Sequence, residues 1–331
     1  MPTGRLGDVA AALAAAAAGT VERDAPLGAL TTWRVGGPAA VLVRVDTVDA
    51  LVSAARTIPP DVAVLVVGRG SNLLVADTGF PGVVIVLGPG FETVQPGADE
   101  FGADESEADV VTAGGATALP VLARQCAAHG RAGLGFYVGI PGSVGGAVRM
   151  NAGGHGRETV EVLLDATVVE IGPDAAPVLR SVDALELGYR HSAITDRQVV
   201  TSARFRVHAG DPETLKAELA EIVRWRAEHQ PGGANAGSVF RNPPGDSAAR
   251  LIDVECGLRG FRFGEASVSE KHANFIQADS GATAEDVHHL IALVRDRVAR
   301  RTGVVLEPEV HRVGFDDPPD DRRDEDRRDD E

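Results

Sequence analysis

Apolar and polar positions along the chain repeat with strand-like and helix-like periods, and their order predicts a mixed helix and sheet protein. Strands are expected at 41–45, 62–67 and 83–87 with a helix at 48–57 between the first two, which makes a β-α-β unit. Further expected strands and helices lie C-terminal to this unit. The strands are 73–75, 110–114, 162–171 and 198–207, and the helices are 119–129, 213–228 and 284–302.

The segment 10–18 is almost entirely alanine and is interpreted as a helix capped by Gly19. It resembles the apolar core of a signal peptide only superficially, because Asp8 precedes it and Glu22 follows soon after. No other stretch is apolar over about 20 residues, so no membrane-spanning helix is expected.

The pattern breaks at 131–156, which holds nine glycines among Ile140, Val144, Ala147 and Val148. Glycine costs roughly 1 kcal/mol in a helix interior, so this segment is predicted to be irregular but apolar backbone. Without Cβ atoms, its main chain could lie directly against a flat or charged ligand and offer N–H groups. The alternative is an ordinary glycine-rich surface loop.

A second glycine loop follows the expected strand at 62–67 and reads Gly-Arg-Gly-Ser-Asn from Gly68 to Asn72. A glycine loop at the carboxyl end of a buried strand is where α/β proteins hold a phosphate. The loop is not the dinucleotide fingerprint, since the third glycine is missing and Leu73 begins a strand instead of a helix.

The 331 residues are 44% hydrophobic, which fits a soluble globular protein of two or three domains. The formal net charge is −16, but ten acids and four arginines between Asp316 and Glu331 contribute −6 of it. That tail is expected to be disordered. Nucleic acid is an unsuitable partner for so acidic a chain.

Cys126 and Cys256 have no zinc-like or disulfide-like spacing, which favours a reducing cytoplasm and no structural metal.

Three polar clusters are candidates for chemistry. Ser238 follows a flexible glycine and precedes a Pro-terminated turn, Glu307 and Glu309 lie two residues apart in an expected extended segment, and Arg190 follows Gly188 and Tyr189. Each has an ordinary explanation as well: a turn serine, a solvated strand edge, and a structural ion pair. No nucleophile elbow surrounds the serine, so nucleophilic catalysis is not indicated.

Seven motifs in one order carry a resemblance that covers about 26–314: TTWRVGGPA, GRGSNLLVADTGFPGVVI, GIPGSVGGAVRMNAGGHG, LGYRHS, NAGSVFRNP, SVSEKHANFI and LEPEV. With these motifs the chain resembles the UDP-N-acetylenolpyruvoylglucosamine reductases. The segment after Val207 is short, so the chain is most similar to the second type of that family. The family belongs to the vanillyl-alcohol-oxidase or PCMH-like flavoproteins.

The resemblance implies an α+β fold with a two-subdomain PCMH-type FAD-binding part and a C-terminal α+β substrate domain. The first subdomain would comprise 1–88 together with 303–315, including the LEPEV segment as a strand. The second subdomain would comprise 89–215, the substrate domain 216–302, and the disordered acidic tail 316–331.

The resemblance also implies an activity. A cytoplasmic, monomeric, FAD-dependent reductase would convert UDP-N-acetylglucosamine enolpyruvate to UDP-N-acetylmuramate with NADPH, in the synthesis of peptidoglycan precursors. Hydride would pass from flavin N5 to C3 of the substrate. Arg190 and Glu309 would stabilise the charge that develops, and Ser238 would protonate C2. No histidine lies in 68–74, where covalent relatives often attach FAD, so non-covalent FAD is expected.

Residue roles are carried over from the family motifs. Cofactor-binding residues would be Gly68, Arg69, Gly70, Ser71, Asn72, Leu73, Gly114, Gly139, Ile140, Pro141, Gly142, Ser143, Gly145, Gly146, Ala147, Asn151 and Gly153. Substrate-binding residues would be Tyr189, Asn242 and His272, and no metal ligands are expected.

Three positions depart from the family pattern: His229 stands where many members have Lys, His311 stands where Arg is usual, and Gly135 before Phe136 stands where Glu is frequent. The alternatives are an oxygen-using oxidase of the same superfamily and a catalytically silent flavin-binding module.

Overall fold

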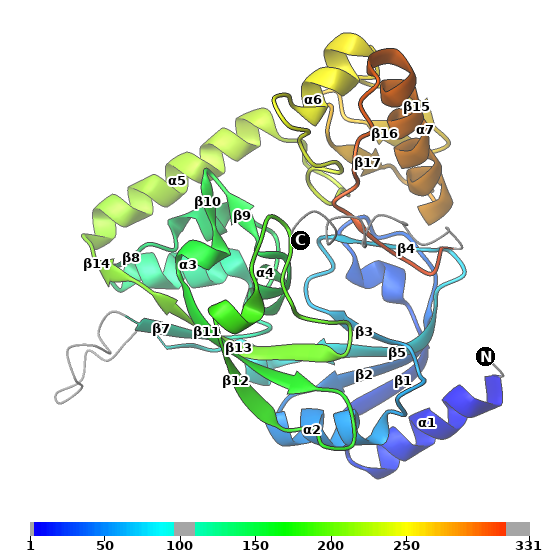
Figure 1. Cartoon of the computed structure of the whole chain (residues 1–331), viewed down its shortest axis with the longest axis vertical. Coiled ribbons are helices and arrows are strands. Elements are labelled where there is room, and N and C mark those ends of the chain that lie inside the picture. The colour runs from blue at the N-terminus through cyan, green and yellow to red at the C-terminus, as the bar shows by residue number, and fades with distance from the viewer. Residues whose placement is uncertain (1–2, 96–109, 316–331) are drawn as a thin grey trace, which may run out of the picture.

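Two β-sheets stand side by side and a smaller α+β unit caps them in the computed structural model, which describes residues 3–95 and 110–315 (Figure 1). The expected acidic tail lies outside the described residues. Within those residues, no helix is both long and apolar enough to cross a membrane.

The first sheet has the strand order β1-β2-β5-β3, with β1 antiparallel to β2 and the other neighbours parallel. Its strands are β1 (Thr20–Ala25), β2 (Ala39–Val45), β5 (Phe80–Leu87) and β3 (Val64–Val67). Helix α2 (Val48–Thr57) has the predicted bounds, and the Thr47 hydroxyl caps it by accepting from the Ala50 N–H. The β-α-β unit is therefore confirmed.

Both faces of this sheet are buried. Val83 and Ile85 of β5 pack into one apolar cluster with α1 and α2, while Val84 and Val86 pack into another on the opposite face. Burial on two faces explains why the strand is a continuous apolar run. The edge strand β1 is mostly exposed and polar, so no pattern predicted it.

Helix α1 (Thr3–Ala15) confirms a helix in the alanine-rich region, but its predicted end at Gly19 is wrong. The chain leaves the helix at Ala15, and Gly19, with φ of 112°, instead leads into β1. A Cβ at Gly19 would lie 2.1 Å from the Arg44 carbonyl oxygen of the neighbouring strand, so close approach explains this glycine.

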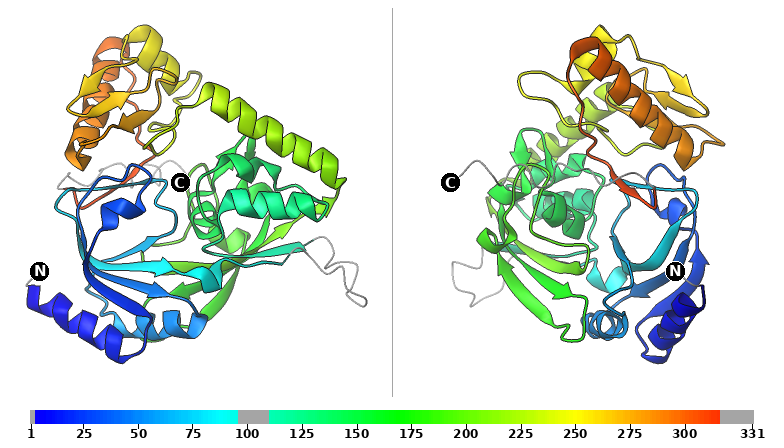
Figure 2. Two further views of the ribbon diagram at one scale, coloured as in Figure 1. Left: turned by 180° about the vertical axis from the view of Figure 1, so that it is seen from behind. Right: turned by 45° about the vertical axis from the view of Figure 1, so that its right-hand side comes forward.

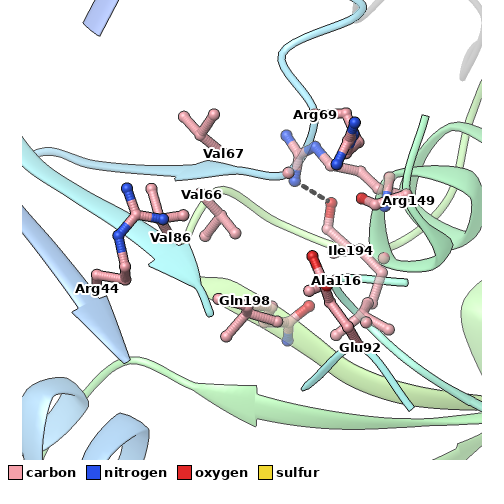
Figure 3. A pocket seen from close by; sticks show the side chains of 17 residues that line it. Arg44, Val66, Val67, Arg69, Val86, Glu92, Ala116, Arg149, Ile194 and Gln198 are labelled. Atoms are coloured by element: carbon pink, nitrogen blue, oxygen red, sulfur yellow. Dashed lines mark hydrogen bonds between the residues drawn. The ribbon is translucent and has the colours of Figure 1, made fainter. Parts of the chain in front are cut away.

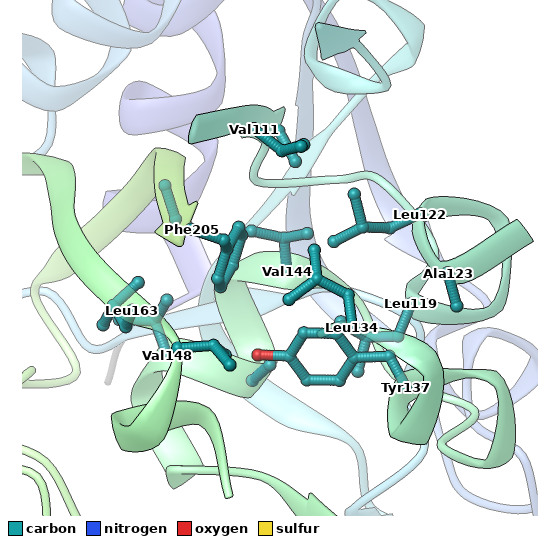
Figure 4. Close-up of a cluster of buried hydrophobic side chains, with 14 of the residues drawn as sticks. Val111, Leu119, Leu122, Ala123, Leu134, Tyr137, Val144, Val148, Leu163 and Phe205 are labelled. Atoms are coloured by element: carbon teal, nitrogen blue, oxygen red, sulfur yellow. The ribbon is translucent and has the colours of Figure 1, made fainter. Parts of the chain in front are cut away.

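The second sheet is antiparallel throughout, in the order β12-β11-β13-β7-β6. The strands are β12 (Pro177–Ser181), β11 (Leu163–Glu170), β13 (Gln198–Arg206), β7 (Val110–Gly114) and β6 (Val94–Gln95). Helices α3 (Leu119–Ala128) and α4 (Val144–Met150) cover one face, with Tyr137 and Phe205 fully buried between them and the sheet (Figure 4). Strand β12 was not predicted, because all five of its residues are exposed.

Helix α4 corrects the prediction that 131–156 is irregular. Ser143 caps this helix by accepting from the Gly146 N–H, and Asn151 ends it with a left-handed φ of 41°. A Cβ on Gly145 would stand 3.2 Å from the Gly115 carbonyl oxygen and 3.3 Å from that of Val200. The glycine therefore lets the helix approach the sheet closely, and packing overrides its poor helix propensity.

The third unit contains a three-stranded antiparallel sheet and helix α7 (Ala284–Thr302), whose bounds match the prediction. The strands are β15 (Arg262–Phe263), β16 (Ala266–Val268) and β17 (Ile276–Ala278), and a short helix α6 (Ala248–Arg250) continues into a π-helix at Leu251–Glu255. Thr283 and Asp286 form a capping box at the start of α7.

Residues from the N-terminal part of the chain anchor this third unit. The indole of Trp33 is 1% exposed, belongs to the apolar cluster around α7, and donates Nε1–H to the Ile276 carbonyl at 3.0 Å. The Asp77 carboxylate accepts from the N–H groups of Ala284 and Glu285 at the start of α7. Both contacts join segments about 200 residues or more apart.

Helix α5 (Pro212–His229) runs from the second sheet to the third unit, which the two further views also show (Figure 2). It starts before the predicted domain boundary at 216, and its buried residue Leu219 packs into the cluster of the second sheet. The domain boundaries themselves stay a prediction.

The C-terminal segment returns to the first unit as β18 (His311–Val313), which is parallel to β4 (Leu73–Val75). The predicted strand at LEPEV is wrong by a few residues. Pro308, which has no N–H, makes only an isolated bridge to Phe240, and regular pairing begins at His311.

Short elements complete the described fold. They are β8 (Arg131–Ala132) paired with β14 (His208–Ala209), β9 (Gly153–Gly154) paired with β10 (Arg157–Glu158), and the 3-10 helices Leu27–Leu30, Pro89–Phe91, Gly135–Gly139, Thr159–Glu161 and Asp183–Leu185.

Candidate active site

A cavity of about 620 Å³ opens where the three units meet. Its wall combines the loop after β3, the segment at the start of α4, the turn between β9 and β10, the end of α5, and residues on either side of the third unit. The predicted residues in this wall are Gly68, Arg69, Gly70, Ser71, Asn72, Leu73, Gly139, Ile140, Pro141, Gly142, Ser143, Gly146, Ala147, Gly153, Arg190, Ser238 and Glu309.

A smaller cavity of about 180 Å³ adjoins the first and lies between the two large sheets (Figure 3). The two cavities share wall residues, among them Gly68, Ser143 and Gly146. Arg44 and Gln198 are among the residues that line the smaller one. The combined space extends from the smaller cavity between the sheets to the larger cavity, whose wall includes residues of the third unit.

The two glycine loops lie against each other in the wall of these cavities. A Cβ on Gly68 would lie 2.3 Å from the Ser143 hydroxyl, and one on Gly142 would lie 3.7 Å from the Ser71 hydroxyl. The loop after β3 is held at its carbonyls, since Gly70 accepts from the Thr32 N–H at 3.2 Å and Asn72 accepts from the His311 N–H at 3.0 Å.

These glycines leave room for a ligand close to the main chain. At Gly146, the only neighbouring atom that a Cβ would meet within 4 Å is the Ser143 hydroxyl. The volume of the larger cavity also lies in the range of cofactor and small-molecule sites. An elongated dinucleotide therefore fits the residues that are present.

Ser238 and Glu309 are brought together by backbone pairing. The Glu309 N–H donates to the Val239 carbonyl at 2.8 Å, and the Arg241 N–H donates to the Glu307 carbonyl at the same distance. Asn72 donates its side-chain amide to the Glu309 carbonyl at 3.1 Å. The backbone of Glu309 thus connects the C-terminal segment with both the glycine loop and the segment that contains Ser238.

The carboxylate of Glu309 has two side-chain partners. Its Oε2 accepts from Arg190 Nε at 3.3 Å, and its Oε1 accepts from the Tyr189 hydroxyl at 3.3 Å. The side chains of Arg190 and Glu309 are only 22% and 14% exposed. Burial raises the pKa of the Tyr189 hydroxyl, and the Glu309 charge adds to that rise, so Tyr189 stays a donor.

The nearby residue Glu307, two residues from Glu309, has a different environment. Its side chain is 58% exposed and lies 3.8 Å from Arg241 Nη1. The two carboxylates therefore do not act as a pair, and Glu309 alone reaches the cavity wall.

Arg190 itself stands in a left-handed conformation with φ of 54°, which is unfavourable for a non-glycine residue. Asn151 holds the turn that imposes this conformation. It is fully buried, donates its side-chain amide to the Gly188 carbonyl and to Glu158 Oε2, and accepts from the Val160 N–H. Glu158 Oε1 lies in turn 3.7 Å from Arg190 Nη1. Asn151 therefore positions the arginine instead of lining the cavity.

Other predicted residues also lie outside the larger cavity wall. Gly145 lines only the smaller cavity, and Gly114 meets Phe91, whose carbonyl oxygen would lie 2.1 Å from a Cβ. The Asn242 side chain accepts from the Ala248 N–H, and His272 Nδ1 accepts from the Asn274 N–H while its ring packs against Phe275. The predicted binding roles of these residues stay predictions.

The sequence interpretation missed the contribution of α5 to the wall, where Trp225, Arg226 and Gln230 line the cavity. Burial lowers the pKa of the Arg226 guanidinium. The chain pattern around these residues is that of any polar helix, so no local signal could have identified them. Arg149, His155 and Phe275 are among the other wall residues that were not predicted, and their local sequence context is ordinary.

Neither histidine that departs from the family pattern removes a wall residue. His311 lines the cavity, whereas His229 stacks on the Trp225 ring outside the wall. Across the described residues, no group of three or more His, Cys, Asp and Glu side chains could hold a metal ion. Both described cysteines are free thiols.

Comparison with known proteins gives matches along nearly the whole chain. Residues 39–173 match a family described as an FAD binding domain, and residues 229–313 match the UDP-N-acetylenolpyruvoylglucosamine reductase C-terminal domain. A UDP-N-acetylenolpyruvoylglucosamine reductase of Rhodopseudomonas palustris strain HaA2 is 43% identical over 87% of this chain and 90% of that protein. One of Agathobacter rectalis is 41% identical over 88% of this chain and 93% of that protein.

Among solved structures, the crystal structure of the corresponding reductase from Thermus caldophilus superimposes with a TM-score of 0.75. That chain is 36% identical, and the match covers 89% of this chain and 99% of that one. The fold class expected from the motifs is confirmed by this structure and by the FAD-binding match.

Proposed function

The chain belongs to the UDP-N-acetylenolpyruvoylglucosamine reductase family, and from this membership we propose how its residues carry out the reaction. It is an FAD-dependent oxidoreductase that reduces the enolpyruvyl group of UDP-N-acetylglucosamine enolpyruvate in the synthesis of peptidoglycan precursors. NADPH is proposed as the source of electrons.

FAD would occupy the elongated space non-covalently, with its adenosine end in the smaller cavity and its diphosphate between the two glycine loops. The arrangement is supported by Gly68, Ser143 and Gly146, which line both cavities, so that the cavities adjoin at the glycine loops. The flavin ring would then lie in the larger cavity, whose wall includes Ser238, Arg190 and Glu309.

When bound, FAD supplies the hydride that adds to C3 of the enolpyruvyl group. Negative charge then grows on C2 and on the substrate carboxylate. We assign the stabilisation of that charge to the Arg190 guanidinium, which offers fixed N–H donors in a partly buried setting where electrostatic interactions are strengthened. Glu309 holds Arg190 in place through the contact to its Nε.

The proton for C2 would come from the Ser238 hydroxyl. A serine is a poor acid in water, so it can serve only against a strongly basic centre held within hydrogen-bonding distance. Its exposed hydroxyl belongs to the cavity wall and follows Gly237, whose φ of 81° turns the chain there. The third unit caps this end of the cavity and would limit water around the reacting atoms.

We further propose that the enzyme is a monomer and acts in the cytoplasm. The two free thiols, Cys126 and Cys256, support a reducing compartment. Light scattering of the purified protein after size-exclusion chromatography tests the monomer, and a dimer would contradict it.

The observation that carries the mechanism is the backbone bond of Glu309 to Val239, the residue after Ser238, together with the presence of Ser238 and Glu309 in one cavity wall. The Ser238→Ala variant should keep flavin reduction by NADPH within a few-fold of wild type. Flavin reoxidation by the enolpyruvyl sugar nucleotide should slow by roughly 10²- to 10⁴-fold, which is the range for loss of a general acid. Stopped-flow absorbance of the two half-reactions measures both steps.

Ser280→Ala is the matched control, since Ser280 is an exposed serine of the third unit outside the cavity wall. Equal slowing of both half-reactions by Ser238→Ala would contradict the proton-donor role. Rapid oxygen consumption by the wild type without the sugar nucleotide would favour an oxidase, and a yellow protein without turnover would favour a silent flavin-binding module.

A further inference from the structure

Trp225 is a large aromatic side chain that remains exposed at the cavity wall. Its residue exposure is 45%, whereas the second tryptophan of the chain, Trp33, is 1% exposed in the core. Exposed tryptophans in a cavity wall are unusual, because burying such a ring is worth a large free energy. The exposed part of the ring is therefore available to a ligand.

Two histidines fix the orientation of this indole. The His229 ring stacks on it with centroids 4.6 Å apart and an interplanar angle of 14°, while the His155 ring meets it edge-on at 5.4 Å. His229 Nδ1 also lies 2.7 Å from the Trp225 carbonyl oxygen, one turn back in α5. We call Trp225, His155 and His229 the aromatic platform. A ring held in this way loses little side-chain freedom when a flat group stacks on it.

A series of contacts along the cavity wall connects the platform with Arg190. A Cβ on Gly153 would lie 3.2 Å from Arg190 Nη1, and one on Gly154 would lie 3.5 Å from the Ile140 side chain. One on Gly139 would lie 3.2 Å from His155 Nε2. Arg190 is thus connected to the platform by contacts of the β9 glycines and of residues 139–140.

A ligand that reacts near Arg190 and also stacks on the platform would carry a flat ring apart from its reacting group. Arg226, next to Trp225 on α5, lines the same stretch of wall with a partly buried guanidinium. A cation beside an exposed aromatic ring matches a ligand in which anionic groups adjoin a planar base.

We propose that Trp225 stacks against the base of a nucleoside-diphosphate ligand and thereby fixes the end of that ligand remote from the reacting carbon. The inference rests on the proposed function, in which both the sugar nucleotide and the dinucleotide coenzyme carry a base beyond a diphosphate. Both ligands offer a base that can stack on Trp225. Removal of the indole should lower the affinity of whichever ligand supplies that base.

The test uses the FAD-loaded protein with UDP, NADP⁺ and inorganic phosphate as probes. Trp225→Leu removes the aromatic ring and keeps an apolar side chain, Trp225→Phe keeps a flat ring, and Val223→Ala alters an exposed apolar residue of α5 outside the wall. Stacking of one base predicts that Trp225→Leu weakens binding of the base-containing probe by roughly 5- to 100-fold in calorimetry. Trp225→Phe should recover most of this loss, and Val223→Ala should change nothing.

Tryptophan fluorescence gives a second readout without turnover. Since the chain has two tryptophans and Trp33 is buried, quenching by a stacking probe must come from Trp225. Quenching by UDP together with its loss of affinity in Trp225→Leu supports the substrate as the source of the base. Quenching by NADP⁺ together with a loss of NADP⁺ affinity in Trp225→Leu supports the coenzyme as the source of the base.

Unchanged affinity of Trp225→Leu for both UDP and NADP⁺ would overturn the inference, as would equal quenching by inorganic phosphate alone. Turnover of the wild-type preparation separates this failure from failure of the proposed function. If the wild type turns over while Trp225→Leu matches it in both affinities, the platform has no role and the reductase assignment stands. If the wild type binds UDP without any turnover, the reductase assignment fails.

Discussion

The Glu309 carboxylate lies 3.3 Å from Nε of Arg190, although 119 residues separate them in the chain. Both side chains are mostly withdrawn from solvent, and Glu309 is also held through its backbone by Val239 and Asn72. A guanidinium fixed in this way needs little reorganisation when charge develops on a bound substrate.

Arg190→Lys should slow flavin reoxidation by the sugar nucleotide by roughly 10²- to 10³-fold, the usual cost of removing a preorganised donor to a developing negative charge. Lysine keeps the charge but lacks the planar fork that contacts Glu309. Flavin reduction by NADPH should change little. Arg300→Lys is the control, because the Arg300 side chain is 79% exposed in its pair with Asp296. A reoxidation rate that survives Arg190→Lys would remove this residue from the mechanism.

Gly146→Ala should separate helix stability from cofactor binding. Alanine is a better helix residue than glycine by about 1 kcal/mol, so the FAD-free protein should unfold at a higher temperature. The added Cβ would point into space that both cavities share, and overpacking there should weaken FAD binding by roughly 5- to 100-fold. Thermal unfolding and FAD titration measure the two effects.

The control for Gly146→Ala is Gly172→Ala, because a Cβ at Gly172 meets no atom within 4 Å and Gly172 lies outside both cavity walls. Undiminished FAD affinity in Gly146→Ala would mean that the cofactor does not pass over this part of α4.

Asp77→Ala should destabilise the junction between the first and third units. The carboxylate accepts from two N–H groups at the start of α7, and loss of a helix N-cap costs about 0.5–2 kcal/mol. Asp77→Asn should lose less, since its amide oxygen can still accept one bond. Urea unfolding of the FAD-loaded protein measures the change. The exposed Asp174 supplies the control Asp174→Ala, and equal stability of both alanine variants would refute the capping role.

His272 should make stability depend on pH. Burial lowers its pKa from the ordinary value of 6.5, and the nearby Arg259 charge lowers it further. Because the folded pKa lies below the unfolded one, the unfolded chain binds the proton more readily. The stabilising contribution is therefore complete above about pH 6.5 and is lost as the pH falls through the folded pKa.

The His272→Asn variant should consequently lose less stability than wild type between neutral and mildly acidic pH, in urea titrations at a series of pH values. Burial also lowers the pKa of His155, so part of the slope should persist in the variant. Identical slopes for variant and wild type would show that His272 carries no differential protonation.

Local periodicity was sufficient for elements whose burial is regular. The bounds of α2 and α7 were predicted correctly because each is capped by its own neighbouring residues, Thr47 in one case and Thr283 in the other. The exposed strands β1 and β12 were missed, since their residues carry no alternation of buried and exposed positions. Helix α4 was missed because its glycines serve contacts with Gly115 and Val200 that the local sequence does not contain.

The motifs of the sequence by themselves determined the family resemblance, the fold class and the flavin chemistry, because each motif is a short segment whose residues are neighbours along the chain. Tertiary structure alone decided that the segments of Ser238 and Glu309 pair through their backbones. It also decided that Asn151 holds the turn before Arg190 and that α5 contributes Trp225 to the wall. Such contacts depend on backbone pairing and helix packing between distant segments, and no local pattern of residues encodes them.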